Sequence, residues 1–302
     1  MDATLPRPTT VVLAQRLQLR AGCDLILASE TFQHTGSFKF RAAHEVASRV
    51  PHPRVITASS GNFGQAVAYA CALHGKGCTV VMPSGSAQVK VDAVRDYGAT
   101  VDLIDTRLIS RGERVRQLAA QDPEAYVASA YDDDLVIAGN ASLGAELAAL
   151  EADVVLAPVG GGGLTAGLVT GLRRAGSRAE VIGAEPLLAN DAARSMREGR
   201  IVVNEQEPAT IADGARTLSL GARNWRILHR ALAGIIEVPE AGIRDAVRVL
   251  FLLANLKTEP TGALAVAAVL QEPARFSGRR VCCVVSGGNV DPAVYREILD
   301  GS

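Results

Sequence analysis

Short apolar runs recur along this chain and alternate with longer stretches in which apolar residues follow a helical period. The runs are rich in Val, Ile, Leu and Cys, which is typical of strands buried on both faces of a parallel sheet. The predicted strands are residues 24–28, 54–57, 78–82, 100–104, 154–156, 180–184, 235–238 and 280–285. The predicted helices are residues 10–20, 66–73, 87–97, 112–121, 135–150, 165–172 and 242–257. Two more are predicted: one is capped by Thr35 or Ser37 and ends near Ser48, and the other begins near Ala263. This alternation predicts an α/β fold whose sheets are covered by helices on both faces.

A loop without side chains follows the strand at residues 154–156. It consists of Gly160, Gly161, Gly162 and Gly163, and a predicted helix begins directly after it. Backbone N–H groups and the helix dipole can together hold a phosphate at such a place. The glycines match neither a dinucleotide fingerprint nor a P-loop, so we expect a phosphate carried by another group. A tightly packed turn or a linker is the alternative interpretation.

Lys39 falls in the first turn of a predicted helix, where the helix dipole is positive. That field, and any burial, lowers the pKa of the ammonium group. A lysine shifted toward neutrality is a candidate nucleophile or base. A solvated surface lysine is the alternative.

Polar residues gather where predicted strands end, which is where open parallel sheets place their ligands. Ser59, Ser60 and Asn62 follow one strand, and Ser286 follows the last one. Glu185 and Asp191 follow another strand and could supply hard oxygens to Mg²⁺ or Ca²⁺, or act as a strand-end acid and a helix cap. The acids at 132–134 precede a helix and are interpreted as its cap.

Composition narrows the possible classes of protein. The chain has 302 residues, is 48% hydrophobic and carries a net charge of −1 without a basic stripe, so we expect no nucleic-acid partner. Five cysteines without CxxC spacing indicate a reducing compartment, and Cys282 and Cys283 are expected in the core. Without a signal-peptide pattern or a bilayer-length apolar run, the chain is predicted to be soluble and cytoplasmic, with no membrane partner.

Taken in order, these motifs resemble the fold-type II pyridoxal-phosphate (PLP) enzymes, specifically the serine/threonine dehydratase and serine racemase group. The matching segments begin with Thr-Gly-Ser-Phe-Lys39-Phe-Arg and end with Ser286-Gly-Gly-Asn-Val-Asp, and so span most of the chain. Between these two segments lie Ser59-Ser-Gly-Asn-Phe-Gly-Gln, Val136-Ile-Ala-Gly, Pro158-Val-Gly-Gly-Gly-Gly, Ile182-Gly-Ala-Glu-Pro, Thr210-Ile-Ala-Asp-Gly and Glu259-Pro-Thr-Gly-Ala.

The resemblance implies a role for each cofactor-site residue. Lys39 would be the Schiff-base lysine, the four glycines would hold the PLP phosphate, Asn62 would contact the ring hydroxyl, and Ser286 would bind the pyridine nitrogen. Phe38 and Leu164 would complete the cofactor site. A neutral hydroxyl beside the pyridine nitrogen makes the cofactor a weaker electron sink than a carboxylate would. The weaker sink favours loss of a β-leaving group over transamination.

The resemblance also implies substrate-side and metal positions. Ser59, Ser60 and Asn62 would bind the substrate carboxylate, Lys39 would take the Cα proton, and Ser60 lies on the opposite face where racemases return a proton. Phe63, Arg111 and Thr217 would line the substrate side. The residues that match a divalent-cation site in the racemases are Glu185, the carbonyl of Ala189 and Asp191, so a structural Mg²⁺ or Ca²⁺ is expected.

Several positions depart from the family pattern near the substrate pocket. Phe63 replaces a usual polar residue, residues 41–43 read Arg-Ala-Ala rather than Arg-Gly-Ala, and Tyr131 and Asp132 stand where relatives have Pro-Phe or Pro-Asn. The substrate is therefore expected to be an unusual β-hydroxy amino acid, such as a hydroxyaspartate or an aryl serine.

The resemblance implies a PLP-dependent ammonia-lyase that converts a β-hydroxy amino acid of the serine, threonine or hydroxyaspartate type to a 2-oxo acid and ammonia. An amino-acid racemase of the same fold is the alternative, and a binding subunit without chemistry is a third. The implied fold has two three-layer α/β domains with mostly parallel sheets, like the tryptophan synthase β-subunit. Residues 1–53 and 132–302 would form the large domain, and residues 54–131 a small mobile domain that closes over the cofactor. A homodimer is expected.

Overall fold

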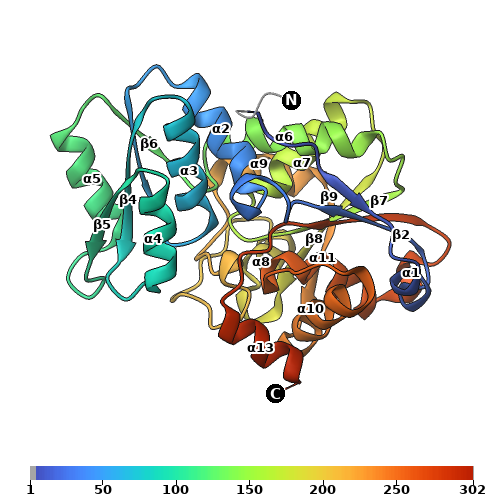
Figure 1. The fold of residues 1–302 in the computed structure, drawn as a ribbon. Helices are drawn as coiled ribbons and strands as arrows, with labels where there is room; N and C mark the ends of the chain where they lie inside the picture. The colour runs from blue at the N-terminus through green and yellow to red at the C-terminus, as the bar shows by residue number, and fades with distance from the viewer. Residues whose placement is uncertain (1–4, 302) are drawn as a thin grey trace.

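The computed structural model describes residues 5–301, which form two sheets lying side by side, each flanked by helices (Figure 1). The larger sheet has the order β1-β2-β10-β7-β8-β9, and the smaller has the order β5-β4-β3-β6. Every strand pairing is parallel except that of β1 with β2. The strands are β1 Thr10–Val12, β2 Asp24–Ser29, β3 Arg54–Ala58, β4 Gly77–Pro83, β5 Thr100–Ile104, β6 Ala125–Ala128, β7 Val154–Pro158, β8 Glu180–Pro186, β9 Leu232–Val238 and β10 Arg280–Val285. The predicted α/β architecture with mostly parallel sheets is confirmed.

Alternate residues of the six-stranded sheet enter two different cores. One face, including Leu27 and Leu156, packs on α1 (Gln15–Ala21), α10 (Glu240–Ala254), α11 (Pro260–Gln271), α12 (Pro273–Phe276) and α13 (Pro292–Asp300). The other face, including Val155, packs on α6 (Asp134–Ala148), α7 (Gly163–Arg174), α8 (Asp191–Glu198) and α9 (Ala222–Ala231). Cys282 and Cys283 point to opposite faces, and both are fully buried, as predicted.

The four-stranded sheet is covered in the same way. Val55 and Val80 pack against α2 (Lys39–Arg49), α3 (Asn62–Leu73) and α4 (Gln88–Asp96), whereas Ile56 and Val81 pack against α5 (Arg111–Gln121). Strands with both faces buried explain why the sequence shows continuous apolar runs rather than alternation.

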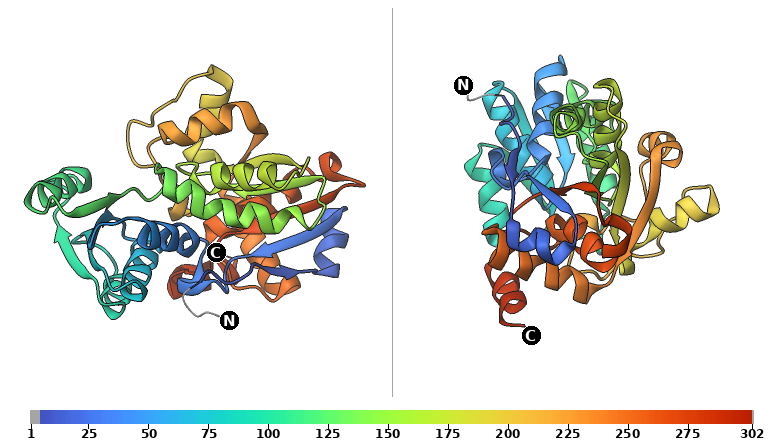
Figure 2. Two further views of the ribbon diagram at one scale, coloured as in Figure 1. Left: turned by 90° about the horizontal axis from the view of Figure 1, so that it is seen from above. Right: turned by 90° about the vertical axis from the view of Figure 1, so that its right-hand side faces the viewer.

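Helices α2 and α6 lie at the junction between the two sheets (Figures 1 and 2). Phe38, just before α2, joins the core of the larger sheet, whereas Phe40 and Val46 join the core of the smaller one. In α6, Val136 packs toward the smaller sheet and Leu143 toward the larger. Because these helices serve both cores, the boundaries expected near residues 53 and 131 stay a prediction.

Two predicted elements differ from the structure. Residues 10–20 form a short edge strand and then α1, because three residues pair antiparallel with β2 before any helix begins. Neither Thr35 nor Ser37 caps α2: Thr35 lies in a 3₁₀ turn with a left-handed φ of 58°, and Phe38 precedes the helix without a side-chain cap. Strands β1 and β6 and helices α8, α9, α12 and α13 were not predicted. Within residues 5–301, no helix is long and apolar enough to cross a bilayer.

Candidate active site

The end of β10 positions the start of α2. The N–H of Phe38 donates to the carbonyl of Ser286 at 3.0 Å, Ser37 forms a β-bridge with Gly287, and the N–H of Gly288 donates to Gly36 at 2.9 Å. Two segments that lie far apart in the sequence are thus joined by backbone hydrogen bonds. They place Lys39 beside Ser286 at the carboxyl edge of the larger sheet.

The side chain of Lys39 is partly buried, and its amine is held by protein groups. Its Nζ donates to the carbonyl of Ala130 at 2.7 Å and lies 5.0 Å and 5.6 Å from the ring centroids of Phe38 and Phe63. Burial lowers the pKa of Lys39 to about 8, and the negative charge of Glu259 partly opposes this. The alternative of a solvated surface lysine does not fit these surroundings.

Asn62 is held from both sides at the first residue of α3. Its Nδ2 donates to the two carboxylate oxygens of Glu259 at 2.8 and 3.1 Å, and its Oδ1 accepts from Asn289 at 2.8 Å. Asn289 also donates to the carbonyl of Thr35, close to Lys39. Four separate segments therefore meet at Asn62.

Glu259 and Asn289 are site residues to which sequence reasoning assigned no individual role. Glu259 is 4% exposed, and its pKa is raised to about 8, first by burial and then by the charge of Asp213. Its motif, Glu259-Pro-Thr-Gly-Ala, was a signal, but only the structure places its carboxylate next to Asn62.

The carbonyl groups of the glycine loop are fixed by two buried asparagines. Gly161 accepts from the side chain of Asn224 at 2.7 Å and from the N–H of Gly221, and Gly163 accepts from Asn140 at 3.1 Å. Within residues 5–301, the N–H groups of Gly161 and Gly162 have no hydrogen-bond acceptor. These N–H groups are therefore free to bind an anion at the N-terminus of α7. Asn140 and Asn224 were missed because a polar residue inside a helix gives no indication of its distant partner.

Only glycine fits in this loop. A Cβ on Gly161 would overlap the ring of Tyr131, and one on Gly163 would lie 2.7 Å from the carbonyl oxygen of Tyr131. Gly162 has a φ of +88°, a left-handed conformation that glycine adopts readily. Because Ala130 binds Lys39 and Tyr131 packs on Gly161, residues 130 and 131 connect the amine to the glycine loop.

Unpartnered polar atoms show where a bound group fits. The hydroxyls of Ser286 and Thr217 are buried and make no hydrogen bond within the described residues. A buried hydroxyl without a partner costs free energy unless a ligand satisfies it. PLP has a group for each of these places. Its ring nitrogen could accept a hydrogen bond from Ser286, its phosphate could bind at residues 160–163, and its aldehyde could react with Lys39. The residues present therefore fit this cofactor.

The predicted substrate-side residues Ser59, Ser60, Asn62, Phe63 and Arg111 come from segments around the smaller sheet, whereas Thr217 lies in the segment before α9. Ser59 and Ser60 form the loop between β3 and α3, where the hydroxyl of Ser59 accepts from the N–H of Gly61 at 3.3 Å. Phe63 is buried beside Lys39. Arg111 begins α5, and its side chain is partly exposed. Burial and nearby acids raise the pKa of Tyr131, and the positive charge of Arg111 partly opposes this rise.

The predicted metal residues make hydrogen bonds of a helix cap. The carboxylate oxygens of Glu185 accept from the N–H groups of Ala192 and Ala193, both at 2.9 Å. Asp191 accepts from Asn204 at 3.0 Å through one oxygen, and its other oxygen is buried without a partner. Among the described residues, no group of three or more His, Cys, Asp or Glu side chains is arranged to hold a metal.

Comparison with known proteins identifies the family of this chain. The family model for pyridoxal-phosphate dependent enzymes matches residues 3–287. The chain is 35% identical over 299 residues to the L-threo-3-hydroxyaspartate ammonia-lyase of a Pseudomonas species, a match that covers 97% of this chain and 93% of that protein. It is 34% identical over 295 residues to the serine racemase of Mus musculus, with 94% and 86% covered.

Among solved structures, a threonine deaminase from T.th. is similar, with a TM-score of 0.90 at 40% identity over 96% of this chain and 95% of that one. The resemblance drawn from the sequence motifs is thereby confirmed. The chain therefore belongs to the family of pyridoxal-phosphate dependent enzymes.

Proposed function

We propose that this protein is a PLP-dependent ammonia-lyase that converts a β-hydroxy amino acid of the serine, threonine or hydroxyaspartate type to a 2-oxo acid and ammonia. The observation that carries the proposal is the amine of Lys39, which donates to Ala130 beside the residue that packs on Gly161, at the start of a helix that is hydrogen-bonded to Ser286. Relatives named as ammonia-lyases for hydroxyaspartate and threonine support this reaction type.

The cofactor would be held by groups from three segments of the chain. The free N–H groups at residues 160–163, and that of Leu164 in the first turn of α7, would bind its phosphate. Ser286 would bind the pyridine nitrogen, Asn62 would bind the ring hydroxyl, and Phe38 would pack beside Lys39. PLP, when bound, supplies an electron sink that stabilises negative charge at Cα of the substrate.

Lys39 would move the proton. Its amine can accept the Cα proton only while it is neutral, and its lowered pKa increases the neutral fraction near physiological pH. Phe38 and Phe63 would exclude water from the amine and so preserve this shift. Activity is therefore expected to rise with pH toward about 8.

The substrate would be bound from the side of the smaller sheet. Ser59, Ser60 and Asn62 would bind its carboxylate at the N-terminus of α3, where backbone N–H groups favour an anion. Arg111 is the cation that supports a second, β-carboxylate group, as in hydroxyaspartate, and the hydroxyl of Thr217 has no partner in the described protein. We therefore place 3-hydroxyaspartate first among the candidate substrates.

Racemisation is the second candidate activity. The side chain of Ser60 makes no hydrogen bond within residues 5–301, so its hydroxyl is free to return a proton to Cα from the face opposite Lys39. The similarity to serine racemase agrees with this activity.

One experiment separates these activities. Both enantiomers of serine, threonine, 3-hydroxyaspartate and phenylserine would be incubated with the purified holoenzyme, and 2-oxo acid release and the chirality of recovered substrate would be measured. Release of oxo acid from hydroxyaspartate is the expected result, and Lys39→Ala should abolish it. Chiral inversion without oxo-acid release would favour the racemase, and absence of both would refute an enzyme for these substrates.

We also propose that Glu185, the carbonyl of Ala189 and Asp191 bind Mg²⁺ or Ca²⁺ in a structural role. The buried oxygen of Asp191, which has no partner among the described residues, supports a cation at this position. Titration of the EDTA-treated protein with each metal chloride should raise its Tm. An unchanged Tm with either metal would leave Glu185 as a cap of α8 only.

Two further expectations belong to this proposal. We propose a homodimer, which light scattering on a sizing column would show as twice the mass of the chain. We also propose a cytoplasmic location, which agrees with cysteines that are all free among the described residues. Recovery in a membrane or exported fraction would contradict it.

A further inference from the structure

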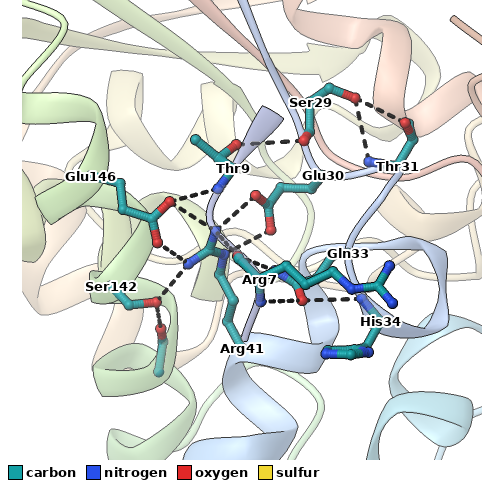
Figure 3. A network of polar contacts seen from close by, with 11 residues as sticks. Arg7, Thr9, Ser29, Glu30, Thr31, Gln33, His34, Arg41, Ser142 and Glu146 are labelled. Carbon is teal, nitrogen blue, oxygen red and sulfur yellow. Dashed lines mark hydrogen bonds and ion pairs between the residues drawn. The ribbon is translucent and has the colours of Figure 1, made fainter. Parts of the chain in front are cut away.

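A buried ion network lies one half-turn of helix beyond Lys39 (Figure 3). Its centre is Arg41, which is 1% exposed. Arg41 makes paired hydrogen bonds to Glu30 at 2.7 and 2.9 Å and to Glu146 at 2.6 and 3.2 Å, and it also donates to Ser142 at 3.0 Å. Glu30 follows β2 and Glu146 lies in α6, so one guanidinium joins α2 to both neighbouring elements.

The N-terminal segment 5–9 completes this network through its backbone. The carbonyl of Arg7 accepts from Arg41 at 3.2 Å and from Gln33 at 2.8 Å, and the N–H of Arg7 donates to Gln33 at 2.9 Å. The N–H of Thr9 donates to Glu146 at 2.7 Å. Figure 3 shows Arg7 and Thr9 of this segment beside Arg41, with the contact from Thr9 to Glu146 as a dashed line.

The charges explain why a backbone N–H is needed there. One guanidinium faces two carboxylates, so the network carries an excess negative charge, shared between Glu30, which is fully buried, and Glu146, whose side chain is 33% exposed. A buried charge is tolerated only when hydrogen bonds satisfy it. The N–H of Thr9 provides such a bond to Glu146, and this bond would be lost if the segment moved away.

The network is connected to the catalytic groups through rigid elements. Arg41 lies two residues after Lys39 in α2, and α6 packs along α7, which begins in the glycine loop. Gly171 of α7 approaches α6 so closely that its Cβ would overlap the carbonyl of Ala141. Fixing α2 against α6 therefore fixes the amine of Lys39 relative to the phosphate loop.

We propose that Arg41 is a positioning residue for Lys39 and that the N-terminal segment 5–9 belongs to the active-site structure, because its backbone completes the hydrogen bonding of Glu146. This inference rests on the proposed role of Lys39 in binding PLP. Neither Arg41 nor the segment touches the reacting atoms.

The test compares two substitutions at residue 9. Thr9→Pro removes the N–H that binds Glu146, whereas Thr9→Val removes the hydroxyl and keeps the N–H. PLP affinity would be measured by equilibrium dialysis of the apoprotein. The titration of Lys39 would be followed separately, as the pH dependence of its acylation in the apoprotein. Thr9→Pro should weaken PLP binding about tenfold and move the midpoint of acylation toward higher pH, and Thr9→Val should change neither.

Arg41→Lys extends the test, because it keeps the charge but cannot make two paired contacts. It should resemble Thr9→Pro rather than the wild type. Wild-type affinity and titration in Thr9→Pro would overturn the proposal, as would equal effects of Thr9→Pro and Thr9→Val. If the wild type binds no PLP, the proposed function fails, but the titration of Lys39 still decides whether the segment positions the amine.

Discussion

Two sets of ionic contacts join the part of the molecule around the smaller sheet to the rest, and they differ in burial. Arg41, at the junction, is enclosed and makes paired contacts to Glu30 and Glu146. At the other edge, Lys90 of α4 lies 3.1 Å from Asp213, with side chains 31% and 43% exposed, and Arg111 lies 3.9 Å from Glu207. Exposed pairs contribute about 0–1 kcal/mol, whereas removing one partner of a buried pair costs about 3–5 kcal/mol.

The difference indicates which side of the site can open. The side that carries Lys39 is held by a buried ion network, whereas the proposed substrate side is held by partly exposed pairs, so we expect any opening to occur on the substrate side. The weak side still reaches the cofactor loop, because Gly214, next to Asp213, donates to Thr261 and lies against Gly160. Small movements at Lys90 can therefore reach the phosphate loop.

The largest expected effect is on the buried side. Arg41→Met leaves the carboxylates of Glu30 and Glu146 without their cation, so the free energy of unfolding should fall by about 3–5 kcal/mol. Urea unfolding of the apoprotein measures it. Arg20→Met, which breaks an exposed pair with Asp245, is the control and should cost less than about 1 kcal/mol. Equal losses in the two variants would remove the distinction between the two sides.

A smaller effect on the buried side should depend on pH. The folded-state pKa of Glu259 is raised from 4.5 to about 8, so the folded protein holds a proton that the unfolded chain releases. Stability of the apoprotein should therefore fall as pH rises from about 4.5 to 8, and Glu259→Gln should flatten this dependence. Lys39 acts in the opposite sense between pH 8 and 10.5, where stability should rise. Unfolding free energies measured across both ranges would test the two signs.

The exposed side should respond mainly in kinetics. Lys90→Met should leave the Tm nearly unchanged but raise KM several-fold if, as we propose, its pair with Asp213 holds the substrate side closed without adding much stability. Arg95→Met in the same helix, which loses only a pair with Asp92, serves as the control. If Lys90→Met lost as much Tm as Arg41→Met, the contact between Lys90 and Asp213 would not be weak.

The smallest effect should come from salt. Raising ionic strength screens exposed charges over about 10 Å at 0.1 M, so KM of the wild type should increase modestly with NaCl. The same salt should change the stability lost in Arg41→Met only slightly, because the pair of Arg41 with Glu30 is buried. Salt dependence that persists in Lys90→Met would assign the effect to other charges.

The sequence was most informative where structure is local. The parallel strands, the bare glycine loop and Lys39 at a helix start are visible as runs and spacings over a few residues. The prediction that Thr35 or Ser37 caps α2 was wrong. Both side chains are able to cap a helix, but the sequence does not show that a β-bridge between Ser37 and Gly287 fixes where α2 begins. Glu259, Asn140 and Asn224 act on partners far away in sequence, and no local pattern encodes such pairs. The position of β1 likewise depends on pairing with β2 rather than on its own residues.

The β-bridge between Ser37 and Gly287 has an expected consequence for how this chain would acquire its cofactor. During synthesis, Lys39 leaves the ribosome long before β10, so the strand that aligns it with Ser286 does not yet exist. Such distant pairings form late, because closing a long loop is entropically costly before other contacts compensate. A nascent chain that stops short of β10 would therefore carry the lysine but could not retain the coenzyme, and coenzyme loading should follow completion of β10 and the turn after it.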